Sequence, residues 1–473
     1  MGDVRIVSRR MVRPELIASG PPETIHLTPW DLRVITVDNI QKGILLPKPP
    51  ATGGRGHDAA AMVERLELSF ARALGRFYPY AGRLAVAPGS KDDAEGERMA
   101  ISLRCSGEGA EFVHAVAPGV AVADITVPLC IPRVVWSFFP LDRLLGVDAI
   151  ADSRPVLAAQ VTELADGVFV AMSANHGVAD GTTFWHFFNT WSEISRLSDG
   201  DAGCEISSPL PVHRRWFLDG CPVPIPLPFG KLEDIVGQRV DTYPPVEECF
   251  LHFSAESVRK LKAKANAEMA GTAATGTAIS SLQALLAHLW RAVCRARRLA
   301  PDQKTTYHLL AGCRGRVDGI PASYAGNAVE HATAISTAGE ILERGLGWAA
   351  WLLNRAVASF DEASARGRLA SWPRNPGFLR MSEVVTAPHP HRTVATGSSP
   401  RFDVYGNDFG WGSPVAVRSG SGNKVDGKVT VYEGRGGGGS IALEVCLSPE
   451  AFPRLLADEE FMGMVDADNC HTY

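Results

Sequence analysis

The sequence predicts an α/β protein with two domains of similar texture, each combining strands and helices. The chain has 473 residues, which is more than one small core accounts for at about 100–200 residues per domain. Strand-like and helix-like patterns alternate through the first half, and the alternation restarts near residue 246 after a proline-rich interruption. We therefore place an N-terminal domain at residues 1–197, a crossover segment at 198–245 and a C-terminal domain at 246–473.

In the first half, apolar residues follow the helix period and the strand period in turn. Residues 58–77 carry apolar side chains at helical spacing until the Tyr-Pro-Tyr-Ala-Gly sequence at 78–82 ends the helix. Residues 181–197 place aromatic side chains such as Phe188 and Trp191 on one face, which predicts a buried helix against a sheet. The predicted strands are 32–37, 101–105, 156–164 and 168–174.

The crossover segment fits neither a helix nor a central strand, because residues 222–228 place proline at every second position. It is too apolar for a free linker, so we expect it to lie over the surface. In the second half, the predicted elements are a strand at 248–253, helices at 257–270 and 280–297, and a twisted hairpin of strands 429–432 and 441–447 within a glycine-rich tail.

The composition excludes several classes of function. The chain is 45% apolar and 21% charged, as in folded domains, and its net charge of −5 gives no general positive field for nucleic acid or an anionic membrane. No segment approaches the ~18 apolar residues of a membrane span. Nine scattered cysteines form no CxxC pair, so we expect reduced thiols and no metal site. We expect a soluble, cytoplasmic monomer.

Common catalytic signatures are missing or match by accident. GxSxG and HExxH do not occur, which removes the commonest serine hydrolase and zinc protease patterns. Residues 434–439 satisfy GxGxxG, but they lie between two predicted strands, whereas a dinucleotide site needs a helix after the loop. We interpret residues 434–439 as a hairpin loop.

The most informative segment runs from Val168 to Trp185. An apolar strand brings His176 to its end, and Gly177 and Gly181 bracket a tight turn, so the imidazole sits on a rigid rim where a catalytic base belongs. Asp180 either projects to the same side as His176 or points inward to a cation and braces the loop. Taken alone, the segment also fits a structural histidine followed by a helix-capping aspartate.

A second segment, Tyr405-Gly-Asn-Asp-Phe-Gly-Trp-Gly-Ser-Pro414, follows far downstream. The order of His176-x-x-x-Asp180-Gly181 and then Asp408-Phe-Gly-Trp-Gly412 resembles the plant BAHD family of acyl-CoA-dependent acyltransferases. The resemblance extends over essentially the full chain. Further blocks similar to the family are Leu27–Asp31, Phe77–Leu84, Ser280–Trp290, Cys313–Arg316 and Tyr324–Asn327. Residues 136–140 and 184–188 resemble a subgroup of acetyltransferase-like members with poorly defined substrates.

The resemblance implies two chloramphenicol-acetyltransferase-like domains, each a mixed sheet flanked by helices, with a channel between them. It also implies that a strand segment near 408–432 completes the first domain. The implied reaction transfers an acyl group from acyl-CoA, a co-substrate, to a hydroxyl or amine of a small-molecule acceptor in plant specialised metabolism. No metal and no permanently bound cofactor is expected. A different class stays open: a family member without transferase activity, acting as a lyase or a ligand-binding protein.

The resemblance assigns roles to the two motifs. His176 removes the acceptor proton as the oxygen or nitrogen attacks the thioester carbonyl, and an ordinary histidine pKa of ~6.5 leaves the ring mostly neutral at about pH 7.5. Asp180 turns away from the channel into an ion pair, for which we predict Arg314 as the partner. Asp408, Gly410 and Trp411 shape the coenzyme side, with Asp408 paired to an arginine and Trp411 either packed in the core or touching the coenzyme.

Coenzyme A phosphates require cations or helix N-termini. The predicted helix at 257–270 offers Arg259, Lys260, Lys262 and Lys264, and Ser280 and Ser281 begin the next helix. A basic helix also fits a solvated face, and that alternative stays open.

One segment departs from the family pattern. Many members carry Ser-Trp upstream of the second motif, whereas this chain has Thr396-Gly-Ser-Ser-Pro-Arg401, with Ser399 in the tryptophan position. Because serine is much smaller than tryptophan, we expect Thr396 and Ser399 to line a wider acceptor pocket.

Overall fold

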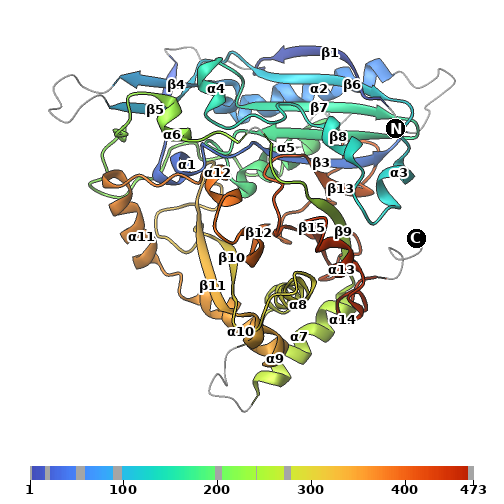
Figure 1. Ribbon diagram of the computed structural model, residues 1–473. Helices are drawn as coiled ribbons and strands as arrows, with labels where there is room; N and C mark the ends of the chain where they lie inside the picture. The colour runs from blue at the N-terminus through green and yellow to red at the C-terminus, as the bar shows by residue number, and fades with distance from the viewer. Residues whose placement is uncertain are drawn as a thin grey trace.

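The computed structural model describes residues 3–15, 22–49, 59–88, 98–197, 205–240, 242–270 and 278–466. Its strands form two large mixed sheets, each backed by helices, and one small sheet. The N-terminal half lies at the top of Figure 1 and most of the C-terminal half at the bottom. The two-body α/β architecture predicted from the sequence is confirmed.

The first sheet has six strands, and its last strand comes from the C-terminal half. Its order is β1 (Arg5–Val12), β6 (Ala110–Ala117), β7 (Leu157–Leu164), β8 (Gly167–Ala174), β3 (Ile40–Pro47) and β13 (Ala416–Ser419). β13 pairs antiparallel with β3, with Ala416 opposite Leu45, and Figure 1 shows it in the upper body. The chain therefore crosses back after residue 400 to complete the sheet that carries His176.

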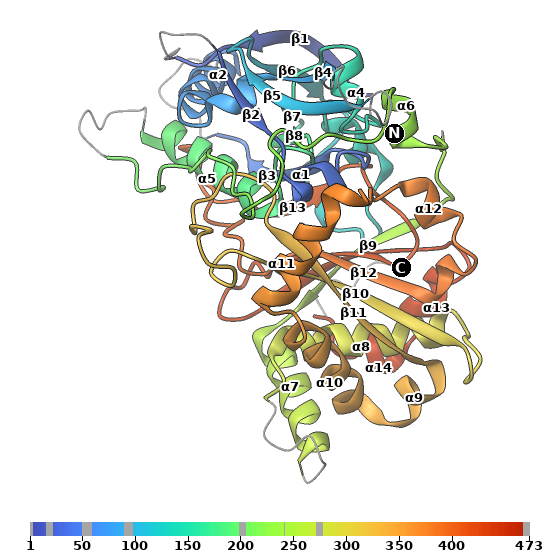
Figure 2. The same cartoon turned by 90° about the vertical axis from the view of Figure 1, so that its left-hand side faces the viewer.

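Two long helices cover the outer face of the first sheet, as Figure 2 shows on its left side. They are α2 (Ala59–Arg76) and α5 (Gly181–Leu197), and their aromatic side chains interlock. Phe70 of α2 meets Trp191 of α5 edge to face, with ring centroids 5.0 Å apart. A small sheet of β2 (Glu23–His26), β5 (Met99–Cys105) and β4 (Arg83–Pro88) adjoins this body.

The second sheet also has six strands. Its order is β11 (Val329–Thr337), β10 (Lys304–Gly312), β12 (Thr393–Ser398), β14 (Lys428–Glu433), β15 (Ile441–Leu447) and β9 (Glu247–Phe253). The helices α7 (Ala255–Met269), α8 (Ser281–Ala296) and α10 (Gly345–Ala358) cover its far side, away from the first body (Figures 1 and 2). The opposite side of the sheet faces the first body.

Shorter helices lie in the connections. They are α3 (Val122–Thr126), α4 (Asp148–Ala151), α6 (Leu232–Val236), α9 (Ala338–Glu343), α11 (Glu362–Ser371), α12 (Met381–Val385), α13 (Phe452–Leu456) and α14 (Glu459–Met462), with 3-10 turns at 78–81, 133–138, 372–374 and 390–392. Among the described residues, none of the helices combines the length and apolar character needed to cross a bilayer.

The crossover segment contacts both bodies. Leu227 forms a β-bridge with Met99 of the small sheet, and Val212 forms one with Tyr324 in the second half. Most of its described residues are exposed or half-buried, so it runs over the surface.

One predicted strand is wrong. Residues 32–37 do not form a strand, because α1 (Pro29–Arg33) and the turn after it occupy this stretch. Thr28 caps the helix, Pro29 begins it, and the Asp31 carboxylate accepts a hydrogen bond from the Thr28 backbone N–H, which completes a capping box. The apolar run after the helix disguised this start signal, and the real strand of this region, β3, begins at Ile40.

A cluster of buried charges joins the two sheets. Lys424 Nζ lies 2.6 Å from Glu248 Oε2 of β9 and also pairs with Glu444 of β15. Ser419 of β13 donates its backbone N–H and its hydroxyl to Glu444. Because all of these side chains are buried, each carboxylate depends on its partners. The cluster fixes β13 against the second sheet.

We expect Lys424→Met to lower the free energy of unfolding by about 3–5 kcal/mol, because it leaves two buried carboxylates without their shared cation. Urea denaturation followed by circular dichroism measures this loss. Lys48→Met, at an exposed position just after β3, is the matched control and should stay near the parent value. A Lys424→Met protein as stable as this control would show that the cluster contributes little.

Candidate active site

His176 lies in the turn between β8 and α5. β8 ends at Ala174, and Asn175 then holds the turn by donating to the Gly146 carbonyl (2.7 Å) and accepting from the Gly177 N–H (2.9 Å). A Cβ at Gly177 would lie 2.9 Å from Ile35 Cγ1, so only glycine fits there without a shift. The backbone of His176 is therefore fixed within the turn.

The His176 side chain is partly exposed, and its environment favours the neutral ring. The residue as a whole is half-buried, and Nδ1 is buried with no hydrogen-bond partner among the described residues. Burial lowers the pKa of His176 below its ordinary value, and the Asp180 charge only partly opposes this effect. A neutral imidazole with an accessible nitrogen can accept a proton near neutral pH.

Asp180 is held by groups from both halves of the chain and does not face a cavity. Arg314 donates to both carboxylate oxygens, at 2.7 Å and 3.1 Å, and is the partner expected from the sequence. The backbone N–H groups of Thr183 and Ala328 each donate to Asp180 at 3.0 Å. Burial alone would raise the pKa of Asp180, but Arg314 and these hydrogen bonds hold it below its usual range.

A second buried network supports the same turn. Asn327 donates to the His176 carbonyl (2.8 Å) and to Asp31 Oδ1 (2.9 Å). Arg215 in turn pairs with Asp31 Oδ2 at 3.1 Å and donates to the Val178 carbonyl at 3.0 Å. Residues from α1, the crossover segment and the second half therefore converge on the backbone at 176–178.

The proposed coenzyme residues lie on the surface of α7 and at the start of α8. Lys260 and Lys262 are exposed, and Lys260 pairs with Glu256 at 2.7 Å. Ser280 caps α8 by accepting from the Gln283 N–H. Asn266 links the two helices, because its side chain bonds both the Lys262 carbonyl and the Ile279 backbone.

The Asp408 loop docks on α5, far from His176. Asp408 Oδ1 accepts the N–H groups of Gly410 and Gly412, which adopt positive φ angles of 108° and 116°. Ser195 of α5 donates to the Phe409 carbonyl at 3.0 Å, which is roughly 20 Å along the helix from Asp180. The loop therefore packs on α5 at a distance from the turn that carries His176.

The prediction that Asp408 pairs with an arginine is wrong. Among the described residues, none forms an ion pair with this carboxylate, which instead binds the backbone of its own tight loop. Trp411 packs against Phe409, with ring centroids 6.2 Å apart, and lies under the Arg65 guanidinium at 5.1 Å.

Thr396 and Ser399 do not share one environment. Thr396 is buried on the helix side of the second sheet, where its hydroxyl meets the Tyr307 hydroxyl at 2.6 Å. The prediction that Thr396 lines the acceptor pocket is therefore wrong, because strand alternation turns it into the core. Ser399 is half-buried, and the nearby Phe402 ring packs against Gly181 at the start of α5.

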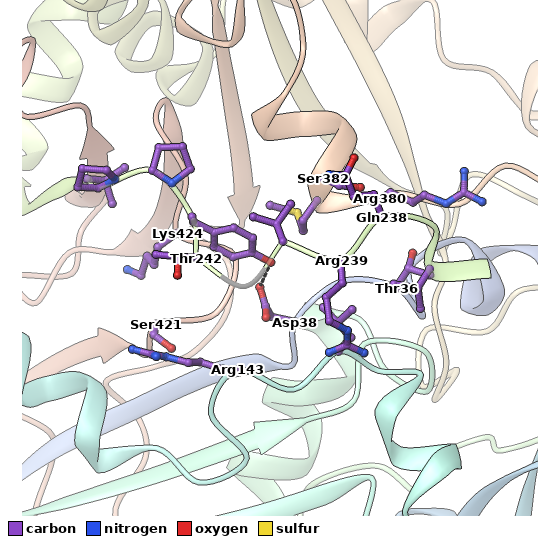
Figure 3. Close-up of a pocket in the computed structure, with 18 of the residues that line it drawn as sticks. Thr36, Asp38, Arg143, Gln238, Arg239, Thr242, Arg380, Ser382, Ser421 and Lys424 are labelled. Atoms are coloured by element: carbon purple, nitrogen blue, oxygen red, sulfur yellow. Dashed lines mark hydrogen bonds between the residues drawn. The ribbon is translucent and has the colours of Figure 1, made fainter. Parts of the chain in front are cut away.

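A pocket of about 370 Å³ opens between the two bodies (Figure 3). Thr36 and Asp38 line it from the first half, one and three residues beyond the Ile35 that packs on Gly177. Tyr243 donates a hydrogen bond to Asp38 across the pocket at 3.0 Å, and Lys424 lines it from the buried cluster. In the part of the chain that is described, no group of three histidine, cysteine or acidic side chains is placed to hold a metal ion.

Comparison with known proteins identifies the family. The profile of the Transferase family matches residues 3–462. An uncharacterised acetyltransferase of Arabidopsis thaliana is 36% identical over 465 residues, covering 98% of this chain and 99% of the relative. The BAHD acyltransferase DCR of the same plant is 31% identical, covering 97% of this chain and 92% of the relative. The chain belongs to the BAHD acyltransferase family.

Solved structures share the BAHD fold. Vinorine synthase superposes with a TM-score of 0.69 at 17% identity, covering 99% of this chain and 100% of that one. TRI101 of F. sporotrichioides, complexed with coenzyme A and T-2, gives a TM-score of 0.70 at 17% identity, covering 94% and 99%. The likeness in fold extends over both bodies.

The network of Asp31, Arg215 and Asn327 was missed in the sequence. Asp31 and Asn327 each end a short block that resembles the BAHD family, at 27–31 and 324–327, and this was the available signal. Arg215 lies in the irregular crossover segment, so no pattern pointed to it. Asp31 and Asn327 are 296 positions apart in the chain, and only the fold brings the three residues into hydrogen-bond contact.

We expect Asp180→Asn to lose about 3–5 kcal/mol of stability, because it leaves the Arg314 charge buried without a partner. The Asp180 carboxylate has a lowered folded-state pKa, so its contribution is present above the unfolded value of ~3.9 and lost as pH falls through the folded value. Urea denaturation at pH 7 and at low pH measures both effects. The exposed control Asp152→Asn should change neither the stability at pH 7 nor its loss at low pH. A fully stable but inactive Asp180→Asn protein would indicate that Asp180 is catalytic.

Proposed function

We propose that this BAHD protein transfers an acyl group from an acyl-CoA thioester to a hydroxyl or amine of a small-molecule acceptor, with His176 as the general base. One observation carries this proposal: a half-buried histidine lies just after the end of a strand, its carbonyl accepts a hydrogen bond from Asn327 of the second half, and burial lowers its pKa, which favours the neutral ring. Coenzyme A bound to a neighbour in fold, TRI101, supports the thioester as donor.

The proposed reaction needs a single proton carrier. His176 Nε2 takes the proton of the acceptor as its oxygen or nitrogen forms a bond to the thioester carbonyl carbon. The tetrahedral intermediate then collapses, the carbon–sulfur bond breaks, and the protonated imidazole returns the proton to the departing thiolate. General base catalysis of this kind contributes about 10²–10⁴-fold.

Asp180 and Arg314 position the base and do not touch substrate. Asp180 is buried and its oxygens are occupied by Arg314 and two backbone N–H groups, which leaves none for an acceptor. The pair fixes the start of α5 against the second half and so sets the direction of the His176 turn.

The coenzyme phosphates are proposed to bind near the junction of α7 and α8. Lys262 is exposed there, and the Asn266 bonds bring its turn next to residue 279, directly before Ser280 and Ser281. The N-terminus of the 16-residue helix α8 adds backbone N–H groups that favour an anion. Asp408, Gly410 and Trp411 contribute by shaping the wall beside α5.

We propose a cytoplasmic location, supported by the state of the cysteines. The seven cysteines within the described ranges form no disulfide with one another, which supports a reducing, cytoplasmic compartment.

Thiol release with a panel of acyl-CoAs and acceptors tests the proposed reaction. We expect His176→Ala to lower kcat by at least about 10²-fold while coenzyme A affinity changes little, because a base acts in the transition state. His186→Ala, on α5 but outside the turn, is the matched control. Near-normal kcat in His176→Ala would contradict the mechanism, and a parent protein that releases no thiol with any pair would favour a lyase or a binding protein.

Ser399 is proposed to line the acceptor side, close to the start of α5. We expect Ser399→Trp to narrow the pocket, so KM should rise for bulky acceptors more than for small ones while coenzyme A binding is spared. Ser371→Trp, at the exposed last residue of α11, is the control. If the KM values of bulky acceptors rise no more than those of small acceptors in Ser399→Trp, Ser399 does not contact the acceptor.

A further inference from the structure

Two lysines from different bodies enter the space between the sheets. Lys42 belongs to β3, and its Nζ lies 5.3 Å from the ring centre of Tyr432 on β14. Lys428 begins β14 and shares a strand face with Tyr432, because the two are four residues apart. Both lysines are half-buried. The two side chains therefore enter the space between the sheets from opposite sides, Lys42 from β3 and Lys428 from β14.

This region adjoins the His176 turn. The Lys428 charge contributes to lowering the pKa of both His176 and His331. A Cβ at Gly397 would lie 2.9 Å from Lys428 Nζ, so the glycine leaves the amine room on this face of the sheet. Lys42 lies opposite Met172 of β8, two residues before that strand ends at Ala174.

Neither lysine amine has a partner among the described residues, in hydrogen bonds or in ion pairs. The nearby carboxylates are already used: Lys424 takes both Glu248 and Glu444, and Arg133 also pairs with Glu248 at 3.2 Å. Four basic side chains therefore face two acidic ones. The imidazoles do not change this balance, since burial lowers the pKa of His331 to about 3.

An unpaired amine at a buried position is energetically unfavourable in its charged form. Burial lowers the pKa of Lys42 to about 7, although Glu444 opposes the effect, and burial also lowers the pKa of Lys428. An anion between the two amines would supply the missing charge and accept short, charge-assisted hydrogen bonds. Carboxylate is the anion that an acyl group or a small acceptor most simply provides.

We propose that Lys42 and Lys428 form a carboxylate-binding subsite beside His176, so that one of the two substrates carries a carboxylate. The inference rests on the proposed acyl transfer and narrows its substrate class. The carboxylate belongs either to the acyl chain of a dicarboxylic thioester or to the acceptor. In both cases the two amines orient that substrate relative to the base without taking part in bond changes.

Calorimetric titration separates the two sources without requiring turnover. One arm compares malonyl-CoA with butyryl-CoA, and the other compares 4-hydroxybenzoate with its methyl ester in the presence of coenzyme A. We expect the carboxylate to bind at least tenfold more tightly than its neutral partner in one arm. Lys42→Met and Lys428→Met should each remove most of that preference and leave the neutral partner's affinity unchanged.

The controls are Lys48→Met after β3 and Lys304→Met at the exposed start of β10, which should keep the preference. Thermal midpoints of Lys42→Met and Lys428→Met should not fall below the parent value, because no ion pair is broken. The subsite is overturned if neither arm shows a carboxylate preference, or if the preference survives in both methionine variants. Thiol release, measured separately, reports on the acyl transfer itself.

Discussion

The ion pair between Asp180 and Arg314 is the constraint on which the turn that carries His176 depends. Asp180 starts α5 in the first body, and Arg314 follows β10 in the second, so the pair closes only when both bodies are in place. Asn327 adds a hydrogen bond to the His176 carbonyl from the same side. The geometry of the His176 turn is therefore a property of the interface, and β13, which crosses back into the first sheet, keeps that interface from separating.

Buried charge is treated in two ways at this interface. Around Lys424, every carboxylate has a cation or a donor, which makes that cluster structural. Lys42 and Lys428 are half-buried, and their amines lack acidic partners among the described residues. The contrast matters because proteins rarely leave buried cations unpaired, and a ligand that completes the charge balance gains affinity and orientation together.

The long amphipathic helices and the paired strands around His176 could be predicted, because their apolar spacing is regular over many residues. The Asp180 partner also followed, from a short arginine block that resembles the family. The start of α1 was misjudged, since Thr28 and Pro29 are local cap signals beside a longer apolar run. The face of Thr396, the partners of Asp408 and the position of Arg215 depend on contacts between residues far apart in the chain. No local pattern records such contacts.

The pH dependence of kcat/KM tests most directly whether a neutral, partly buried His176 is the base. This ratio reports ionisations of the free enzyme. Because burial lowers the pKa of His176, kcat/KM should fall on the acid side with an apparent pKa below the ordinary ~6.5. An acid limb with an apparent pKa above 6.5, or one that persists unchanged in the residual activity of His176→Ala, would contradict the account.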